Sequence, residues 1–231
     1  MLFENGKIDV FDRTYTPTTL AGSFTDDTIP PVYSPFNVRA IGDKVYVTYA
    51  RQDGDGDVLP GNGAGFVSVF DTDGNFLNRF ASGQHLKTPW GMAMAPANFG
   101  EFGGALLVAN NGNGRINAFD PASGSFLGQL RDGDGAPVVI DGLFGLDFGN
   151  GRTSGDTDAL YFTAAPDNHR HGLFGSLRVV ADSDDAPAGP GASDFGHGMP
   201  AGVESLESLS PLFADLENWV GGEDGDDSLL S

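Results

Sequence analysis

The sequence predicts an all-β protein built from repeated antiparallel sheet units, and three observations lead to this fold class. A segment of the form Gly-x-(Ile/Val)-x-(Val/Ala)-Phe-Asp occurs at residues 6–12, 65–71 and 114–120. Apolar residues alternate within each copy, as expected for a strand that is buried on one face. Phe11, Phe70 and Phe119 are therefore expected to occupy equivalent buried positions in successive units. The copies recur at a spacing of roughly 50 to 60 residues, which is typical of an array of sheet units.

Each unit is expected to contain four strands, and the Gly-x-x-x-x-Phe-Asp copies are the third of them. The first strand is predicted at 34–38, 88–94 and 141–148, and the second at 44–49, 105–109 and 159–163. The fourth is predicted at 75–80 and 125–130. The Asp that ends each third strand is a residue that opens turns, so it is expected to begin the connection to the fourth strand.

Four short antiparallel strands joined by Gly, Asp and Asn turns describe one blade of a β-propeller. A single blade cannot bury both of its faces, so blades must stack around an axis. The chain carries two strands of a first blade and then three recognisable blades, the last with a weak fourth strand. We therefore expect a partial β-propeller of three and a half blades over residues 1–181. A β-sandwich is the alternative.

The segment 88–130 resembles an NHL-type repeat. The resemblance is carried by Pro89-Trp90-Gly91-Met92-Ala93 and by residues 106–110, 113–120 and 124–127. Because NHL repeats build six-bladed propellers, the resemblance implies that the blades belong to a six-bladed ring. Residues 5–178 also resemble a family of secreted bacterial propellers with no established activity, and the matching stretches are 5–12, 35–37, 60–63, 99–100, 103–107 and 171–177. This resemblance implies an extracellular or cell-surface location for the full-length protein.

The chain begins in the middle of a blade, and we expect an N-terminally truncated piece of a six-bladed protein. The alternative is that two chains complete one ring. An open arc exposes apolar sheet faces, and such patches normally become covered. Self-association is therefore expected through the exposed blade edges or through a helix at Val203–Val220. The chain has no basic segment followed by an apolar one at its N-terminus, so it shows no signal peptide.

Composition excludes several classes of partner. Asp and Glu number 32 against 12 Lys and Arg, which gives a net charge of −20. Nucleic acid is not an expected partner, because binding its phosphates requires Lys and Arg. Membrane insertion is not expected either, since no apolar run approaches the ~18 residues of a span. The absence of cysteine removes disulfides and thiolate chemistry.

An Asp-rich and Lys-poor composition also suits high salt, which indicates a halophilic source or a Ca²⁺-rich extracellular setting. Screening relieves the repulsion between like charges, so stability is expected to rise as ionic strength increases from low values. Melting temperatures measured between low and molar KCl check this prediction. An unchanged melting temperature would count against a halophilic origin.

The C-terminal part of the chain changes character. Residues 182–202 form an acidic linker rich in Pro and Gly, and residues 203–231 carry an amphipathic pattern with an acidic end. The apolar residues of that pattern recur every three to four positions: Val203, Leu206, Leu209, Leu212, Phe213, Leu216, Trp219 and Val220. This spacing predicts two short helices. They would cover an exposed blade face or bind a groove on a partner, and a disordered tail is the third interpretation.

Two segments are candidate metal sites. Asp53, Asp55 and Asp57 alternate on a Gly-rich loop, a pattern that can converge on Ca²⁺; the alternative is ordinary turn composition in an acidic protein. His169 and His171 stand beside Asp167, and on a strand both imidazoles would share one face, as many Zn²⁺ sites require. The alternative is that His171 orders the turn while His169 is solvated.

Propellers bind ligands at the mouth of the central channel, on loops next to the innermost strand. By repeat alignment, the candidate ligand residues at one mouth are Asn37, Trp90, Asn110, Asp141 and Phe144. The leading hypothesis is a non-enzymatic scaffold that binds a protein or a glycan there. A metal-dependent hydrolase or lactonase of the six-bladed type is one alternative, and a fragment without independent activity is another. Trp90 and Phe144 could instead serve only to pack neighbouring blades.

Overall fold

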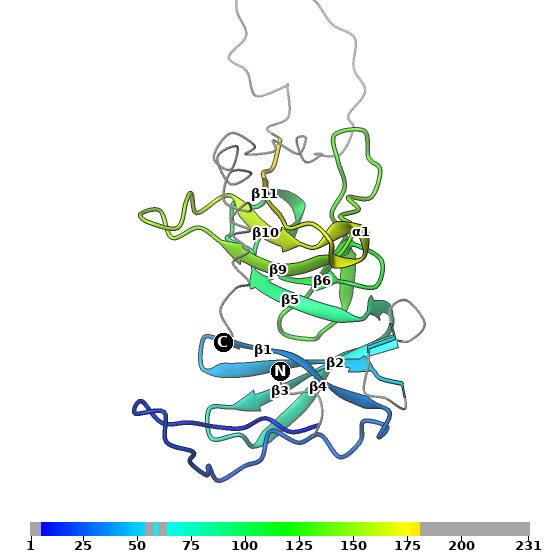
Figure 1. Ribbon diagram of the computed structural model, residues 1–231. Coiled ribbons are helices and arrows are strands. Elements are labelled where there is room, and N and C mark those ends of the chain that lie inside the picture. The colour runs from blue at the N-terminus through cyan, green and yellow to red at the C-terminus, as the bar shows by residue number, and fades with distance from the viewer. Residues whose placement is uncertain (1–5, 54–57, 60–63, 181–231) are drawn as a thin grey trace, which may run out of the picture.

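A computed structural model describes residues 6–53, 58–59 and 64–180, and it confirms the all-β fold class (Figure 1). The described chain forms three antiparallel sheets of four, four and three strands. The first sheet contains β1 (Tyr33–Ile41), β2 (Lys44–Arg51), β3 (Ala64–Asp71) and β4 (Phe76–Lys87). The second contains β5 (Pro89–Met94), β6 (Leu106–Asn110), β7 (Arg115–Phe119) and β8 (Phe126–Gln129). The third contains β9 (Leu143–Phe148), β10 (Leu160–Ala164) and β11 (Leu173–Leu177).

Strands that follow one another in the chain are neighbours in each sheet. The order is β1-β2-β3-β4, then β5-β6-β7-β8, then β9-β10-β11. This is the meander expected from the repeats, because short turns can join only adjacent antiparallel strands. The strand β4 extends to Lys87, seven residues beyond the predicted end. No fourth strand follows β11 in residues 178–180, which are the last of the described residues.

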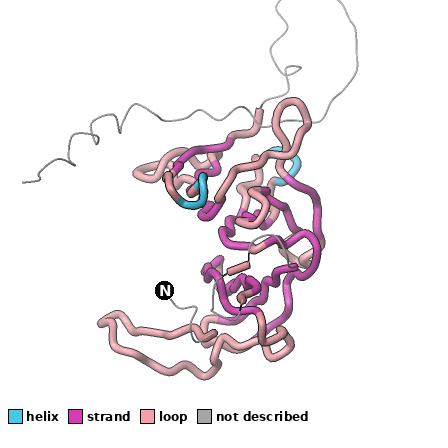
Figure 2. Tube along the Cα trace, turned by 45° about the vertical axis from the view of Figure 1, so that its right-hand side comes forward, coloured by secondary structure: helices cyan, strands magenta, loops and turns pink. Residues whose placement is uncertain are grey.

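The three sheets stack one above the other in chain order. In Figure 1 the segment 6–24 lies at one end of the stack and β11 at the other, and Figure 2 shows the two ends apart. The first strands of the sheets lie side by side, since β5 packs against both β1 and β9. Within the described residues the sheets do not close into a ring.

The core consists of three apolar clusters, and each lies between consecutive units. Phe70 belongs to the cluster between the segment 6–31 and the first sheet, where its ring lies 5.6 Å from Phe24. Phe119 belongs to the cluster between the first and second sheets, where its ring lies 6.2 Å from Phe80. Both equivalent side chains therefore face the unit that precedes them in the chain.

The first repeat copy differs from the prediction that all three motif phenylalanines are buried. Residues 6–12 form no regular strand, and a single bridge joins Phe11 to Pro17. Phe11 is 54% exposed, whereas Phe70 and Phe119 are 0% and 2% exposed. Ile8 and Val10 pack against the first cluster, so by strand alternation Phe11 points the other way. It faces the preceding side, where its ring is largely exposed.

The Asp at the end of each motif opens a turn, as the sequence predicts. Asp12 Oδ1 accepts the backbone N–H groups of Thr14 and Thr16. Asp71 and Asp120 bond in the same way to backbone groups two to four residues ahead. Hydrogen bonds to the ionised carboxylates, led by those of the Thr14, Asn75 and Ser123 side chains, lower the pKa of the three aspartates.

A glycine in one of these turns allows the sheets to approach closely. Gly124 has φ +70°, and a Cβ built there would lie 1.8 Å from the carbonyl oxygen of Phe80 in the preceding sheet. No residue with a side chain fits at that distance. The glycine in the turn after this motif copy therefore sets the contact between the first and second sheets.

Two groups of sequence predictions fall outside the described residues. The amphipathic pattern at 203–220 and the linker before it belong to residues 181–231. Asp55 and Asp57 of the proposed Ca²⁺ loop lie in the segment 54–57. No helix in the described part of the chain is long and apolar enough to cross a membrane.

Candidate binding site at the inner strands

An aromatic row crosses the first strands of the three sheets. Phe36 on β1 meets Trp90 on β5 with ring centroids 4.4 Å apart, and Trp90 meets Phe144 on β9 at 5.3 Å. Both pairs are edge-to-face, which is a favoured geometry for aromatic rings. His169 extends the row, because its ring lies 5.6 Å from that of Phe144.

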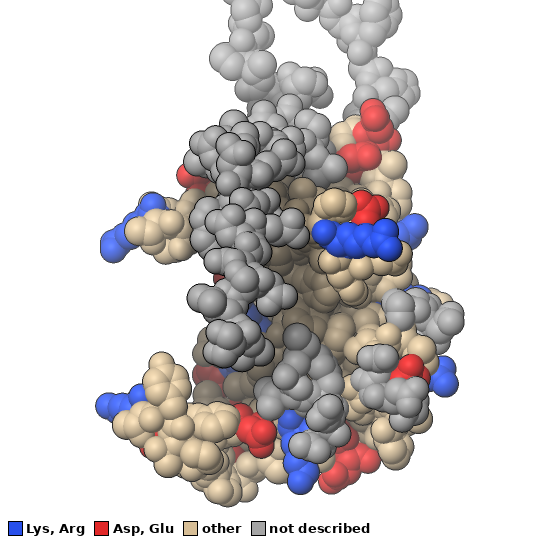
Figure 3. Space-filling view, in the orientation of Figure 1, with Lys and Arg blue, Asp and Glu red and all other residues tan. Residues whose placement is uncertain are grey.

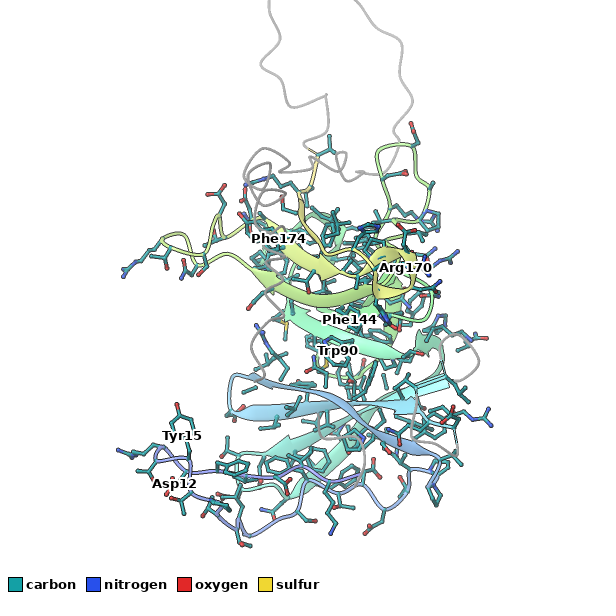
Figure 4. All side chains as sticks on the ribbon, in the orientation of Figure 1. Asp12, Tyr15, Trp90, Phe144, Arg170 and Phe174 are labelled. Carbon is teal, nitrogen blue, oxygen red and sulfur yellow. The ribbon has the colours of Figure 1, made fainter. Side chains whose placement is uncertain are left out.

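The row becomes more accessible along its length. Phe36 is 8% exposed, Trp90 and Phe144 are partly exposed, and His169 is exposed. Trp90 and Phe144 lie near the middle of the molecule in Figure 4. Two of the predicted ligand residues thus combine packing between sheets with a surface that a ligand can reach.

Asparagine side chains fix the spacing of the inner strands. Asn37 Nδ2 donates to the Trp90 carbonyl at 2.9 Å, which joins β1 to β5. Asn111 Nδ2 donates to the Leu143 carbonyl at 3.0 Å, which joins the second sheet to β9. A Cβ at Gly91 would lie 2.4 Å from the Phe144 carbonyl oxygen, so only glycine permits this approach of β5 to β9. These contacts hold Trp90 and Phe144 in register.

The other two predicted mouth residues lie in different surroundings. Asn110 is fully buried; its Oδ1 accepts the Lys87 N–H and its Nδ2 donates to the His85 carbonyl. Because both ends of this amide are occupied, Asn110 has a structural role in the described fold. Asp141 is exposed, and its Oδ2 accepts the Asp167 N–H at 3.2 Å.

The turn that carries His169 has an unusual backbone. The short helical element α1 (Pro166–His169) contains Asp167 and Asn168 with φ +56° and +55°, and His169 has φ +65°. Residues other than glycine rarely adopt this left-handed backbone region, and each one that does costs about 1–3 kcal/mol. Such outliers cluster at ligand-binding segments. The turn borders the candidate site through the contact of His169 with Phe144, and Asp, Asn and His are the residue types other than glycine that most often adopt this region.

The structure does not place the two histidines on a strand, so the alternation argument for a Zn²⁺ pair does not apply. His169 packs on Phe144, while His171 Nε2 lies 3.7 Å from Asp167 Oδ2 on the surface. In residues 6–53, 58–59 and 64–180, no group of three His, Asp or Glu side chains is placed to hold a metal ion. Asp53 is described, but its two partners in the proposed Ca²⁺ loop are not.

Charged side chains of both signs lie beside the aromatic row. Figure 3 shows Lys, Arg, Asp and Glu side chains scattered over the visible described surface, without a large patch of one sign. Asp167 and Arg170 are exposed on the turn that carries His169, and Asp141 is hydrogen-bonded to that turn. One ion pair is found at the inner strands: Arg39 on β1 and Asp147 on β9 are 2.7 Å apart. A ligand at the aromatic row would therefore meet rings, with charged groups of both signs beside them.

A second polar cluster, which the sequence reasoning missed, joins the segment 6–31 to the first sheet. Asp26 Oδ2 accepts hydrogen bonds from Ser68 and Arg79, and Arg79 forms an ion pair with it at 2.7 Å. Asp26 Oδ1 accepts the backbone and side-chain donors of Thr28. Burial alone would raise the pKa of Asp26, but these hydrogen bonds hold it below its ordinary value. With both oxygens occupied, this carboxylate is structural.

Tyr49 stands next to that cluster with its hydroxyl buried and without a hydrogen-bond partner in the described part of the chain. Burial, followed by the charge of Asp26, raises the pKa of this phenol. The residue borders a hollow of about 140 Å³ beneath the segment 6–31. The sequence indicates this polar cluster only through Asp26-Asp27-Thr28, a pattern in which the Asp side chain often binds backbone N–H groups ahead of it.

Three proteins of Acanthamoeba polyphaga mimivirus, each named as uncharacterised, are similar to this chain. The first is 41% identical over 181 residues, which cover 76% of this chain and 44% of the relative. The second is 40% identical over 176 residues, covering 74% and 46%. The third is 36% identical over 186 residues, covering 78% and 34%. The chain thus spans less than half the length of each of these relatives.

No protein-family model matches the chain. The resemblance drawn from the sequence was to bacterial proteins, whereas these relatives are viral, and their names state no activity. A functional inference therefore has to come from the geometry of the site.

Proposed function

We propose that this chain is an arc of β-propeller blades that acts as a non-enzymatic binding scaffold, with a protein or a glycan held at the row of Trp90, Phe144 and His169. The observation that carries the proposal is the row itself. Rings from consecutive sheets line up on the inner strands and become accessible toward His169. Aromatic surfaces with a few fixed polar groups are typical of binding sites.

The arrangement of the sheets supports the propeller interpretation. The first strands of all three sheets lie side by side, and the first and second sheets turn the same motif phenylalanine toward the unit before them. This is how blades stack around an axis. The resemblance to NHL repeats supports assigning the sheets to a six-bladed type of propeller.

The chemistry of the row favours recognition by contact area rather than by charge. Indole and phenyl rings bury a large apolar surface and present a polarised face to C–H groups. The C–H faces of sugar rings and the aromatic or apolar side chains of a protein both match such a surface. The asparagine amides that fix the row are occupied by backbone groups, so the site is held in place before a ligand arrives.

A binding screen tests this proposal. Glycan and peptide arrays probed with the full chain should yield ligands, whose affinities are then measured by calorimetry. We expect Phe144→Ala to weaken binding at least about tenfold, as for other central aromatic contacts. Trp90→Phe keeps a ring between its neighbours and should weaken binding less than Phe144→Ala.

Leu127→Ala is the matched control, because Leu127 is 52% exposed on β8 and lies outside the row. The affinity of the Leu127→Ala variant for the same ligands should equal that of the unmodified chain. If neither Phe144→Ala nor Trp90→Phe changes the affinity for a ligand, that ligand does not bind at the row. Turnover of lactones or esters in the presence of Ca²⁺, lost in the Phe144 variant, would favour the hydrolase alternative instead.

A further inference from the structure

The interface between consecutive units occurs repeatedly inside this chain, always with the same polarity. One side of each unit faces the following unit, as Val67 and Val69 do from the first sheet. The other side faces the preceding unit, as Phe119 does from the second. Across the next interface, Ile116 and Ala118 face forward and Leu160 faces back. Every unit thus has a forward face and a backward face that differ in composition.

At the first end of the described stack the backward face is open. Phe11 takes the position that Phe70 and Phe119 take in the later copies, yet it is 54% exposed. The hollow of about 570 Å³ beside this hairpin is not part of that face, because Ile8, Val10, Leu20 and Phe24 in its lining pack toward the first sheet. Figure 4 marks this end of the molecule with Asp12 and Tyr15.

At the opposite end the forward face of the third sheet is open at Phe174, whereas the turn at Gly155 and Asp156 packs against the hydroxyl end of Tyr161. The register pairs Tyr161 with Ser176 and Thr163 with Phe174, which puts these four side chains on one face. The other face of β10 is buried against the second sheet. Phe174 is 53% exposed and stacks on Tyr161 with ring centroids 5.8 Å apart. Figure 4 shows Phe174 at the end of the stack far from Tyr15.

The open forward face matches the forward face that is used inside the chain. In the sequence repeat, Lys44-Val45-Tyr46-Val47-Thr48 aligns with Ala159-Leu160-Tyr161-Phe162-Thr163. Tyr46 belongs to the cluster that covers Phe119, and its ring lies 5.6 Å from Phe80. Tyr161 is therefore the counterpart of a side chain that already covers a motif phenylalanine. The surface best suited to cover Phe11 is one that this chain itself carries.

We propose that the 231-residue chain associates head to tail with a second copy, so that the Tyr161–Phe174 face of one copy covers the Phe11 face of the other. The contact repeats between chains the packing seen between sheets within the chain. Because the two faces are different, the association is heterologous and each copy keeps one face for a further contact, unless two copies close on each other.

Light scattering on the full chain tests this proposal. The chain mass is 24.1 kDa, and we expect at least twice this mass at micromolar concentration. The measurement is made at physiological ionic strength and in about 1 M KCl, because screening weakens the repulsion between copies of net charge −20. Phe11→Asp and Phe174→Asp should each be monomeric, since each variant lacks one of the two faces.

Mixing the two variants gives the decisive result. Phe11→Asp keeps its forward face and Phe174→Asp keeps its backward face, so an equimolar mixture should form a species of two chains. Leu127→Asp, which changes an exposed side chain outside both faces, should behave like the unmodified chain. Circular dichroism confirms that each variant is folded, and Ser176→Arg on the same face replaces Phe174→Asp if the latter unfolds.

A monomeric unmodified chain in both salt conditions would overturn the proposal, and it is the result expected if residues 181–231 cover one of the faces. Variants that still associate alone would overturn it as well, because the contact would then lie elsewhere. A mixture that stays monomeric would show that the two faces do not bind each other.

Discussion

Replacing Phe119 with alanine is expected to lower the free energy of unfolding by about 3–5 kcal/mol, the usual range for a buried phenylalanine. Phe119 is 2% exposed and its ring contacts both Phe80 and Phe126. Its loss leaves a cavity between the first two sheets, and the neighbouring strands cannot close it because the glycine turn already holds them in contact. Urea denaturation followed by circular dichroism measures the change.

Phe11→Ala is the matched control in the same motif position. Because Phe11 is 54% exposed, its replacement should change the stability of the single chain by no more than about 0.5 kcal/mol. The two variants therefore separate the sequence motif from its structural context. Equal losses from both would show that the packing on the first repeat copy differs from the structure described above.

The pair of phenylalanines also shows how far the sequence could predict this fold. Alternating apolar residues and a turn-forming Asp are local signals, so the strands around Phe70 and Phe119 were predicted close to their observed bounds. Burial of Phe11 was predicted from the same local pattern and was wrong. Whether a strand face is buried depends on what packs against it, and that information is not local.

The candidate site shows the same division. Trp90 and Phe144 were found because both occupy the same place in the repeat, and the repeat puts equivalent residues of adjacent sheets next to each other. His169 lies beside Phe144 because the chain turns in the left-handed region at residues 167–169, and there is no glycine at these positions to indicate such a turn. Asn110 was placed at the mouth by the same repeat logic, but its side chain turns into the fold and bonds to backbone groups.

The buried pair of Asp26 and Arg79 lay beyond sequence reasoning for a related reason. The two residues are 53 positions apart, and Asp26 looked like one more acid in an acidic chain. In the structure its side chain is 0% exposed and that of Arg79 is 22% exposed. Arg79 also lies over the ring of Phe66 at 4.6 Å, so the guanidinium is held by a ring as well as by the carboxylate.

Replacing Asp26 with alanine is therefore expected to lower the free energy of unfolding at neutral pH by about 3–5 kcal/mol, because a buried charge on Arg79 loses its partner. Asp26→Asn retains part of the hydrogen bonding and should cost less. A double variant, Asp26→Asn with Arg79→Met, removes both charges and should regain part of the loss of Asp26→Ala. Denaturant unfolding of the three variants gives these values.

The pH dependence gives the pair an independent signature. The pKa of Asp26 is lower in the folded chain than in the unfolded chain, so the unfolded state binds a proton more readily. The stabilisation is then fully present above the unfolded pKa, near pH 4, and is lost as pH falls through the folded pKa. The stability difference between the unmodified chain and Asp26→Asn should shrink over that range. Asp147→Ala, which breaks the exposed pair with Arg39, should cost much less at neutral pH. A difference for Asp26→Asn that stays constant down to low pH would mean that the carboxylate is not held ionised by its donors.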